Sequence, residues 1–309
     1  ALLGALAIAG REDAERWGAE RARVAFVAMG RYGGRECSYA SDADVIALHE
    51  AVGGASDSEA AASATAIVNR VKKLLGSATS QLGIVVDLDL RPEGKNGPMS
   101  RTIASHEEYA QRWASTWERQ AAVRARPIGD GELAQAARSL FESMAYRDVS
   151  EAEVRDIRLL KARMENERLP RGTEPARHVK LGPGGLSDVE WTIQLIQMRH
   201  GREVEALRTS STTDAIAAAR DVGLLGTSDA EILLNAWDLA TRIRAGNTLA
   251  TGRMSGVKLD VVPRDSAELG ALAAILGYGS GGLTALEEDW LRAARQARDV
   301  MERAFWEQQ

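Results

Sequence analysis

Cysteine is almost absent from this sequence, and long apolar runs are absent altogether. Cys37 is the single cysteine among 309 residues. An internal disulfide and a multi-cysteine zinc site are therefore excluded, as is usual for proteins of a reducing compartment. The longest apolar runs, such as Val24–Met29 and Ala271–Leu276, are far shorter than the roughly 20 residues that cross a bilayer. The Ala-rich start lacks the basic region and cleavage pattern of a secretory signal. We expect a cytoplasmic protein with no membrane segment.

An excess of positive charge is lacking as well. The formal net charge is -5 and the pI is near 5.6. Proteins that grip a nucleic-acid backbone usually cluster Lys and Arg on one face, so we expect no nucleic-acid partner. The four histidines show no metal-ligand spacing and are expected to be structural or solvated: His49, His106, His178 and His200.

The length and composition favour a soluble protein of two domains. A chain of 309 residues with 45% hydrophobic content can bury a sizeable core. The sequence starts without Met, which is consistent with a fragment of a longer chain.

The first part of the chain carries strand signals around a glycine turn. Val24–Met29 and Asp44–Leu48 are short apolar runs typical of buried strands, and Ile84–Leu90 is a third. The Ala-rich stretch 58–82 has its larger apolar residues on one helical face. Ser105–Glu108 has capping-box spacing and predicts a helix that continues to about Arg126.

The second part is predicted to be helical. From about Glu132 onward the strand signals nearly disappear, and amphipathic stripes take their place. Glycine-rich loops at 180–185 and 277–282 separate these stripes. We expect an α+β domain over 1–130 and an all-helical domain over 131–309.

Acidic pairs stand where two of the predicted strands meet their loops. Because alternate strand residues share a face, Asp42 and Asp44 would lie together, and Asp87 and Asp89 would do the same on the third strand. If the strands are neighbours, their mutual repulsion requires a cation, and oxygen ligands suit Mg²⁺ or Mn²⁺. A solvated turn or a helix cap is the alternative reading of a lone Asp-x-Asp, and it stays open here.

The adjacent Gly33 and Gly34, just before these acids, would let backbone N–H groups approach nucleotide phosphates. Two glycines alone add little to the case for a nucleotide site. The combination with a strand on each side and a second acidic pair strengthens it.

Four segments, in order along the chain, resemble the bifunctional glutamine synthetase adenylyltransferase/deadenylylase family: residues 30–44, 86–94, 117–126 and 179–190. The resemblance covers about residues 24–200. It implies a DNA polymerase β-like nucleotidyltransferase domain followed by a helical domain, with ATP as substrate. It also implies glutamine synthetase as the protein that is modified, and a PII-type nitrogen signal protein as a further partner.

Carried over residue by residue, the resemblance implies that Asp42, Asp44 and Asp87 are catalytic metal ligands. Asp89 departs from the pattern, because the family usually has arginine there. Further nucleotide contacts are implied at Gly33, Gly34, Ser41, Arg91, Arg124, Arg126 and Lys180. For Arg124 and Arg126, a surface or interdomain salt bridge is an equally good explanation, and the glycine-rich turn after Lys180 is equally well explained as a plain connection between helices.

The resemblance also bears on the direction of the reaction. Ser187–Glu190 and Glu118–Arg124 are closer to the half that attaches AMP to a tyrosine than to the half that removes it by phosphorolysis. We expect the adenylylating half. The deadenylylating half and a non-catalytic nucleotide-sensing module are the alternatives.

Overall fold

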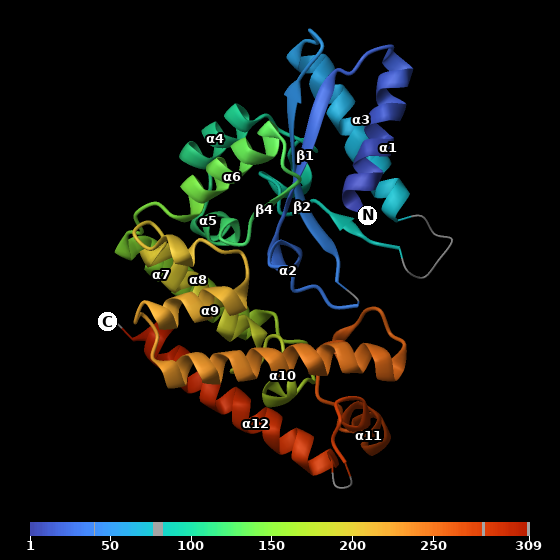
Figure 1. The fold of residues 1–309 in the computed structure, drawn as a ribbon. Helices are drawn as coiled ribbons and strands as arrows, with labels where there is room; N and C mark the ends of the chain where they lie inside the picture. The colour runs from blue at the N-terminus through green and yellow to red at the C-terminus, as the bar shows by residue number, and fades with distance from the viewer. Residues whose placement is uncertain (40, 77–82, 280–281, 308–309) are drawn as a thin grey trace. The chain divides into compact units, whose positions relative to one another are not determined.

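The computed structural model describes residues 1–39, 41–76, 83–279 and 282–307 (Figure 1). The chain divides into two compact units, each with its own core. The first comprises Ala1–Cys37 and Ser41–Arg147, and the second comprises Asp148–Gln309 with the short piece Ser38–Ala40.

The first unit is an α+β structure around a four-stranded sheet of order β3-β2-β1-β4. Its elements are α1 (Leu2–Trp17), β1 (Ala22–Ala28), α2 (Gly30–Gly33), β2 (Ala43–Ala51), α3 (Asp57–Leu75), β3 (Val86–Asp87), α4 (Ile103–Arg112), α5 (Thr116–Ala122), β4 (Arg126–Ile128) and α6 (Glu132–Ala145). Strand β1 pairs antiparallel with β2 and β4, whereas β2 and β3 are parallel. Helices α1 and α3 lie on one side of the sheet, and α4, α5 and α6 lie on the other (Figure 1).

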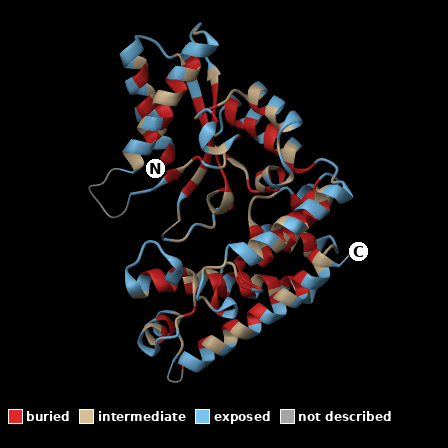
Figure 2. Cartoon of the chain, turned by 180° about the vertical axis from the view of Figure 1, so that it is seen from behind, coloured by how far each residue is buried: buried red, intermediate tan, exposed pale blue. Residues whose placement is uncertain are grey.

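The strand core follows from the apolar runs. Every residue of β1 except Arg23 is buried, and so are most residues of β2 (Figure 2). Helix α3 begins with a capping box in which Ser56 and Glu59 satisfy each other's backbone N–H groups, and Gly76 follows its last residue. Its apolar face, which includes Ile67 and Val71, packs into the core under the sheet.

Two expectations about this unit need correction. The predicted strand Ile84–Leu90 forms pairs only at Val86–Asp87, because the Asp89 N–H donates to Asp87 Oδ1 (2.6 Å) and turns the chain. The predicted helix from Ser105 to Arg126 is broken. Thr102, rather than Ser105, caps α4, and the chain restarts at a second capping box, Ser115 with Glu118, to form α5.

The boundary of the first unit lies after Arg147, whereas the sequence suggested 130. Helix α6 accounts for the difference, because it packs against β1 and β4.

The second unit is helical. Its elements are α7 (Glu151–Glu167), α8 (Leu186–His200), α9 (Thr212–Asp221), α10 (Thr227–Thr251), α11 (Ser266–Ile275) and α12 (Gly282–Met301), with a short π-helical end at Glu302–Trp306. Helices α7, α10 and α12 each turn one side to the core and one side outward (Figure 2), whereas no residue of α8 is exposed. Trp290 of α12 is buried there, and its indole N–H donates to Ala176 O (2.8 Å). Among the described helices, none is both long and apolar enough to cross a membrane.

His106 makes the stability of the first unit depend on pH. Its ring is buried on α4, with its centroid 5.2 Å from that of Phe141 on α6. Burial, assisted by the nearby Arg101 charge, lowers the pKa of His106 from 6.5 to about 4. The unfolded chain therefore binds the extra proton first.

We expect the free energy of unfolding to fall as the pH drops below about 6.5 and this effect to level off below about 4. The contribution of His106 reaches about 3 kcal/mol at most. In urea titrations at pH 7.5 and 5, His106→Gln should lose less stability than the parent chain. An equal loss in both proteins would assign the pH dependence to other groups.

Candidate active site

The site is built where the chain leaves β1 and returns along β2. The turn between these strands begins with the one-turn helix α2, and Gly30 enters it with φ of 50°, a conformation that glycine adopts without strain. A Cβ placed on Gly30 would lie 3.0 Å from Asp44 Oδ2. The Asp44 carboxylate therefore sits directly against the backbone at the start of the turn, and the absence of a side chain at Gly30 gives it room.

The two acidic strands are neighbours, which is the condition that the sequence left open. In the parallel pair of β2 and β3, Asp44 is the partner of Asp87. Residues in register on adjacent strands are about 4.8 Å apart and point to the same face. Asp42 lies two residues before Asp44, at an exposed position just outside β2.

These acids fit a divalent cation in part. Carboxylate oxygens are the donors that Mg²⁺ and Mn²⁺ prefer. However, within the described ranges no group of three or more His, Cys, Asp or Glu side chains is gathered closely enough to hold a metal. The structure brings together the pair Asp44 and Asp87, and it does not gather Asp42 with them.

Asp89 belongs to the loop that follows the acidic edge. Its carboxylate lies 3.2 Å from Lys95 Nζ and 3.9 Å from a nitrogen of Arg91. Those cations offset its charge inside the loop. The position at which this chain departs from the family pattern therefore has a local structural role.

Arg91 holds the same loop together. Its guanidinium donates to the carbonyl oxygens of Leu88 (2.9 Å), Lys95 (3.1 Å) and Gly97 (3.2 Å). A side chain that spans three carbonyls fixes the path of the chain just after Asp87.

The glycine pair has structural reasons of its own. The Gly33 N–H donates to Met29 O (2.7 Å) and the Gly34 N–H to Gly30 O (3.2 Å), so both N–H groups serve the turn. A Cβ on Gly33 would lie 1.9 Å from the carbonyl oxygen of Arg124. Gly33 is required because the backbone of a distant segment passes over it.

Arg124 and Arg126 surround this turn. They lie on no helix, contrary to the sequence prediction: Arg124 follows α5, and Arg126 starts β4 opposite Ala28. Arg124 Nε donates to Gly30 O (3.2 Å), and its guanidinium pairs with Glu36. Arg126 donates to Gly33 O (2.8 Å) and Tyr32 O (3.0 Å).

Two more residues were expected at the nucleotide, Ser41 and Lys180. Ser41 precedes Asp42 and forms a hydrogen bond with Cys37. Lys180 belongs to the second unit and is exposed, at the start of the glycine-rich loop. The backbone N–H groups of Lys180 and Leu181 lie 3.3 Å and 3.1 Å from His178 Nδ1, which therefore accepts them as a neutral ring.

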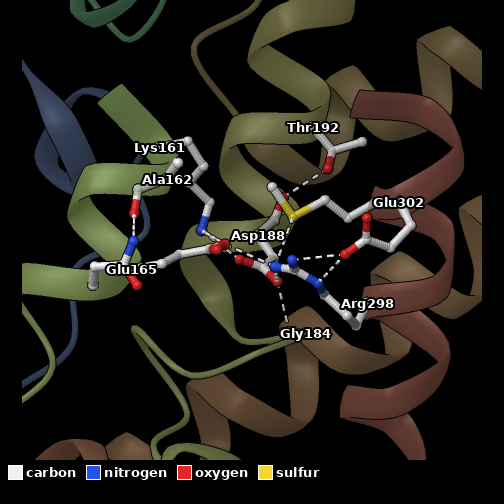
Figure 3. A network of polar contacts seen from close by, with 10 residues as sticks. Lys161, Ala162, Glu165, Gly184, Asp188, Thr192, Arg298 and Glu302 are labelled. Carbon is white, nitrogen blue, oxygen red and sulfur yellow. Dashed lines mark hydrogen bonds and ion pairs between the residues drawn. The ribbon is translucent and has the colours of Figure 1, made fainter. Parts of the chain in front are cut away.

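Asp188, in the first turn of α8 after that loop, is buried and is the centre of a polar network (Figure 3). It lies 2.5 Å from Lys161 Nζ and 3.1 Å from Arg298, and it accepts the Gly184 N–H at 2.8 Å. Burial acts to lower the pKa of Arg298, but Asp188 and Glu165 outweigh it and raise that pKa. These contacts give Asp188 a structural role that links α7, α8 and α12.

Two family models match the chain, and they divide it much as its units do. The one described as glutamate-ammonia ligase adenylyltransferase matches residues 5–140, and the one described as GlnD PII-uridylyltransferase matches residues 158–305.

Curated relatives cover nearly the whole chain. Three of them are each named bifunctional glutamine synthetase adenylyltransferase/adenylyl-removing enzyme. The relative from Streptomyces coelicolor is 45% identical over 296 residues, 94% of this chain and 29% of its own length. Those from Bifidobacterium longum subsp. infantis and Mycobacterium marinum are 46% and 39% identical, over 93% and 96% of this chain and 27% and 30% of their own lengths.

The chain belongs to this family. It spans less than a third of the length of these relatives, which are named for two opposite activities on glutamine synthetase. The family recognised from four motifs is thereby confirmed, and the matched segments include the turn and both acidic strands.

Sequence reasoning missed Gly30 as a site residue and β4 as a strand. Gly30 stands only three residues before Gly33, and its contact with Asp44 depends on a backbone angle that no sequence pattern specifies. Strand β4 is three residues long and contains Pro127, which is a poor strand signal.

The close passage of Arg124 over Gly33 gives a stability prediction. Gly33→Ala should lower the free energy of unfolding by about 1–3 kcal/mol, because the added methyl group overlaps backbone that cannot swing aside. Urea unfolding followed by circular dichroism measures this change.

Gly10→Ala is the matched control, since a Cβ there meets nothing within 4 Å. Gly10 lies inside α1, where alanine is the better helix former, so this substitution should not lower the free energy of unfolding. Equal stability of the two variants would contradict the packing described for Gly33.

Proposed function

We propose that the chain transfers AMP from ATP to a tyrosine hydroxyl of glutamine synthetase, using the acidic edge of a DNA polymerase β-like nucleotidyltransferase domain. The single observation that carries this proposal is the pairing of Asp44 with Asp87, next to a turn that opens at Gly30. The names of the relatives supply the substrate.

The paired carboxylates make a bound cation energetically favourable. Two unit charges about 4 Å apart repel by about 4 kcal/mol at an effective dielectric of about 20. Asp44 and Asp87 would hold Mg²⁺ or Mn²⁺, and Asp42 would join them from the segment just before β2. Such ions, when bound, activate an attacking oxygen and stabilise a leaving phosphate oxygen.

The chain's own contribution is position and charge. The β2 and β3 pair presents two carboxylates at one edge, and Gly30 keeps the space beside Asp44 free of a side chain. Ser41 next to Asp42, and Lys180 with its exposed ammonium group, remain predicted contacts of the ATP phosphates.

The direction of the reaction and the regulatory partner are each supported by one feature of the chain. Ser187–Glu190 and Glu118–Arg124 resemble the adenylylating half, so the deadenylylating half is the second candidate. The match of the second unit to a family described by PII-uridylyltransferase is in keeping with a PII-type protein as a regulatory partner.

The three carboxylates proposed as metal ligands should each be essential for AMP transfer. Asp42→Asn, Asp44→Asn and Asp87→Asn each remove a charge without changing shape, and we expect AMP transfer to fall by at least about 100- to 1,000-fold. Transfer of label from ATP to glutamine synthetase at saturating Mg²⁺ is the measurement, with thermal unfolding as a check of folding.

Asp89→Asn is the matched control on the same segment, because Lys95 and Arg91 already offset the Asp89 charge. Its activity should stay within a few-fold of the parent. A greater loss of activity for Asp89→Asn than for Asp87→Asn would show that Asp89, and not Asp87, is the metal ligand on this segment.

The direction of the reaction is tested by two mixtures. In the first, unmodified glutamine synthetase receives ATP and Mg²⁺, and AMP should appear on tyrosine with release of pyrophosphate. In the second, the AMP-modified protein receives inorganic phosphate, and ADP release should be absent. Reaction in the second mixture alone would assign the chain to the deadenylylating activity.

A further inference from the structure

Helix α2 is too short to satisfy its own carbonyl groups. The last four carbonyls of any helix lack partners inside it, and α2 has only four residues. Backbone N–H groups of Gly34, Glu36 and Arg35 reach three of them. Guanidinium groups from 93 and 94 residues away donate to the fourth, Gly33 O, and add a second hydrogen bond at Gly30 O and at Tyr32 O.

The two guanidinium groups are already engaged by this turn. Arg124 is 4% exposed and divides its donors between Gly30 O and the Glu36 carboxylate. Arg126 directs two nitrogens to adjacent carbonyls of the turn, with its guanidinium 5.8 Å from the centroid of the Tyr32 ring. The Nε of each side chain donates to a carbonyl of the turn, so the turn fixes the orientation of both guanidinium groups.

The backbone that carries these arginines is fixed to the sheet. Arg126 is the partner of Ala28 in the pairing of β4 with β1, and the Arg124 carbonyl packs on Gly33. Residues 124–126 therefore hold α2 through both backbone and side chains. We call these residues the arginine clamp.

The clamp acts on the acidic edge through Gly30. The Met29 N–H donates to Asp44 O (2.9 Å), and the Gly30 Cα faces Asp44 Oδ2. Any movement of α2 changes the space beside that carboxylate, in which a cation has to fit.

We propose that Arg124 and Arg126 are positioning residues that set the distance between α2 and the Asp44 carboxylate, and thereby the affinity for the divalent cation, rather than ligands of the ATP phosphates. This inference rests on the function proposed above. Lysine cannot replace either residue, because a single ammonium group lacks the planar fork that reaches two oxygens at once.

The test is Mn²⁺ binding to the whole chain without nucleotide, measured by electron paramagnetic resonance well below the lowest unfolding temperature. Arg124→Lys and Arg126→Lys should each raise the Mn²⁺ dissociation constant by about tenfold, the lower end of the effect of groups that orient metal ligands. If the arginines bound only phosphate, Mn²⁺ affinity without ATP would equal that of the parent, and the proposal would be overturned.

Arg119→Lys is the matched control. Arg119 is 3% exposed, lies on α5 of the same unit, and donates to the carbonyls of Met144 (3.0 Å) and Ala145 (3.4 Å) at the end of α6. Its substitution should lower the unfolding temperature as the other two do, yet leave Mn²⁺ affinity unchanged. An equal loss of Mn²⁺ affinity in Arg119→Lys would show that general destabilisation, not the clamp, is responsible.

Glu36→Gln covers the case in which an arginine variant does not fold. It loosens Arg124 while keeping its guanidinium, and the Mn²⁺ dissociation constant should rise a few-fold; an unchanged value overturns the proposal. Failure of the parent chain itself to bind Mn²⁺ would overturn the proposed function, and the clamp's role with it. Equal Mn²⁺ affinity in the parent and in all variants would overturn the positioning role of Arg124 and Arg126 and leave the proposed function standing.

Discussion

The acidic edge depends on a parallel strand pairing that is only two residues long. Ala43 pairs with Val86 and Asp44 with Asp87, and the Ala43 N–H donates to Val85 O just before (2.8 Å). A strand pair this short depends on contacts made by neighbouring residues outside it. Val86 and Leu88 anchor it in the core, and the loop that follows is closed by the Arg91 guanidinium. Helix α3 provides the crossover that a parallel pair requires.

The carboxylates of the two units differ in how their charges are offset. In the second unit, the buried Asp188 is surrounded by Lys161, Arg298 and a backbone N–H, so that its charge is offset within the protein. Removing one partner of such a buried group leaves an uncompensated charge and is strongly destabilising. The carboxylates of the first unit lie at a strand edge instead, where two of them share one face. That placement suits an external cation, whereas the placement of Asp188 suits the folding of helices around it.

Much of the first unit could be predicted from local patterns. The apolar runs identified β1 and β2, and the alternation of Asp42 and Asp44 pointed to the edge where Asp87 lies. The Ala-rich start gave no signal for α1. The length of β3 was overestimated because Asp89 ends it through a side-chain contact, which hydrophobicity does not report. Both Ser105 and Ser115 have a glutamate three residues later, as a capping box requires. Only Ser115 forms a capping box in the structure, because Thr102 caps α4.

The site itself was predicted less completely, because its geometry comes from contacts between distant segments. Arg124 and Arg126 were recognised as part of a motif, yet their partners lie on α2, near the start of the chain. Gly33 was explained by phosphate contact, whereas a carbonyl oxygen of Arg124 occupies the space that a Cβ would need. Sequence spacing identifies such residues but cannot show which backbone they face.

Strand β4 also decides how the sheet ends. It is an outer strand in the order β3-β2-β1-β4, and its central residue is Pro127, the partner of Val27. Proline has no N–H, and an outer strand interrupted by proline is a poor template for pairing with another chain. The segment that holds the turn beside Asp44 thus also protects this side of the sheet from edge-to-edge association.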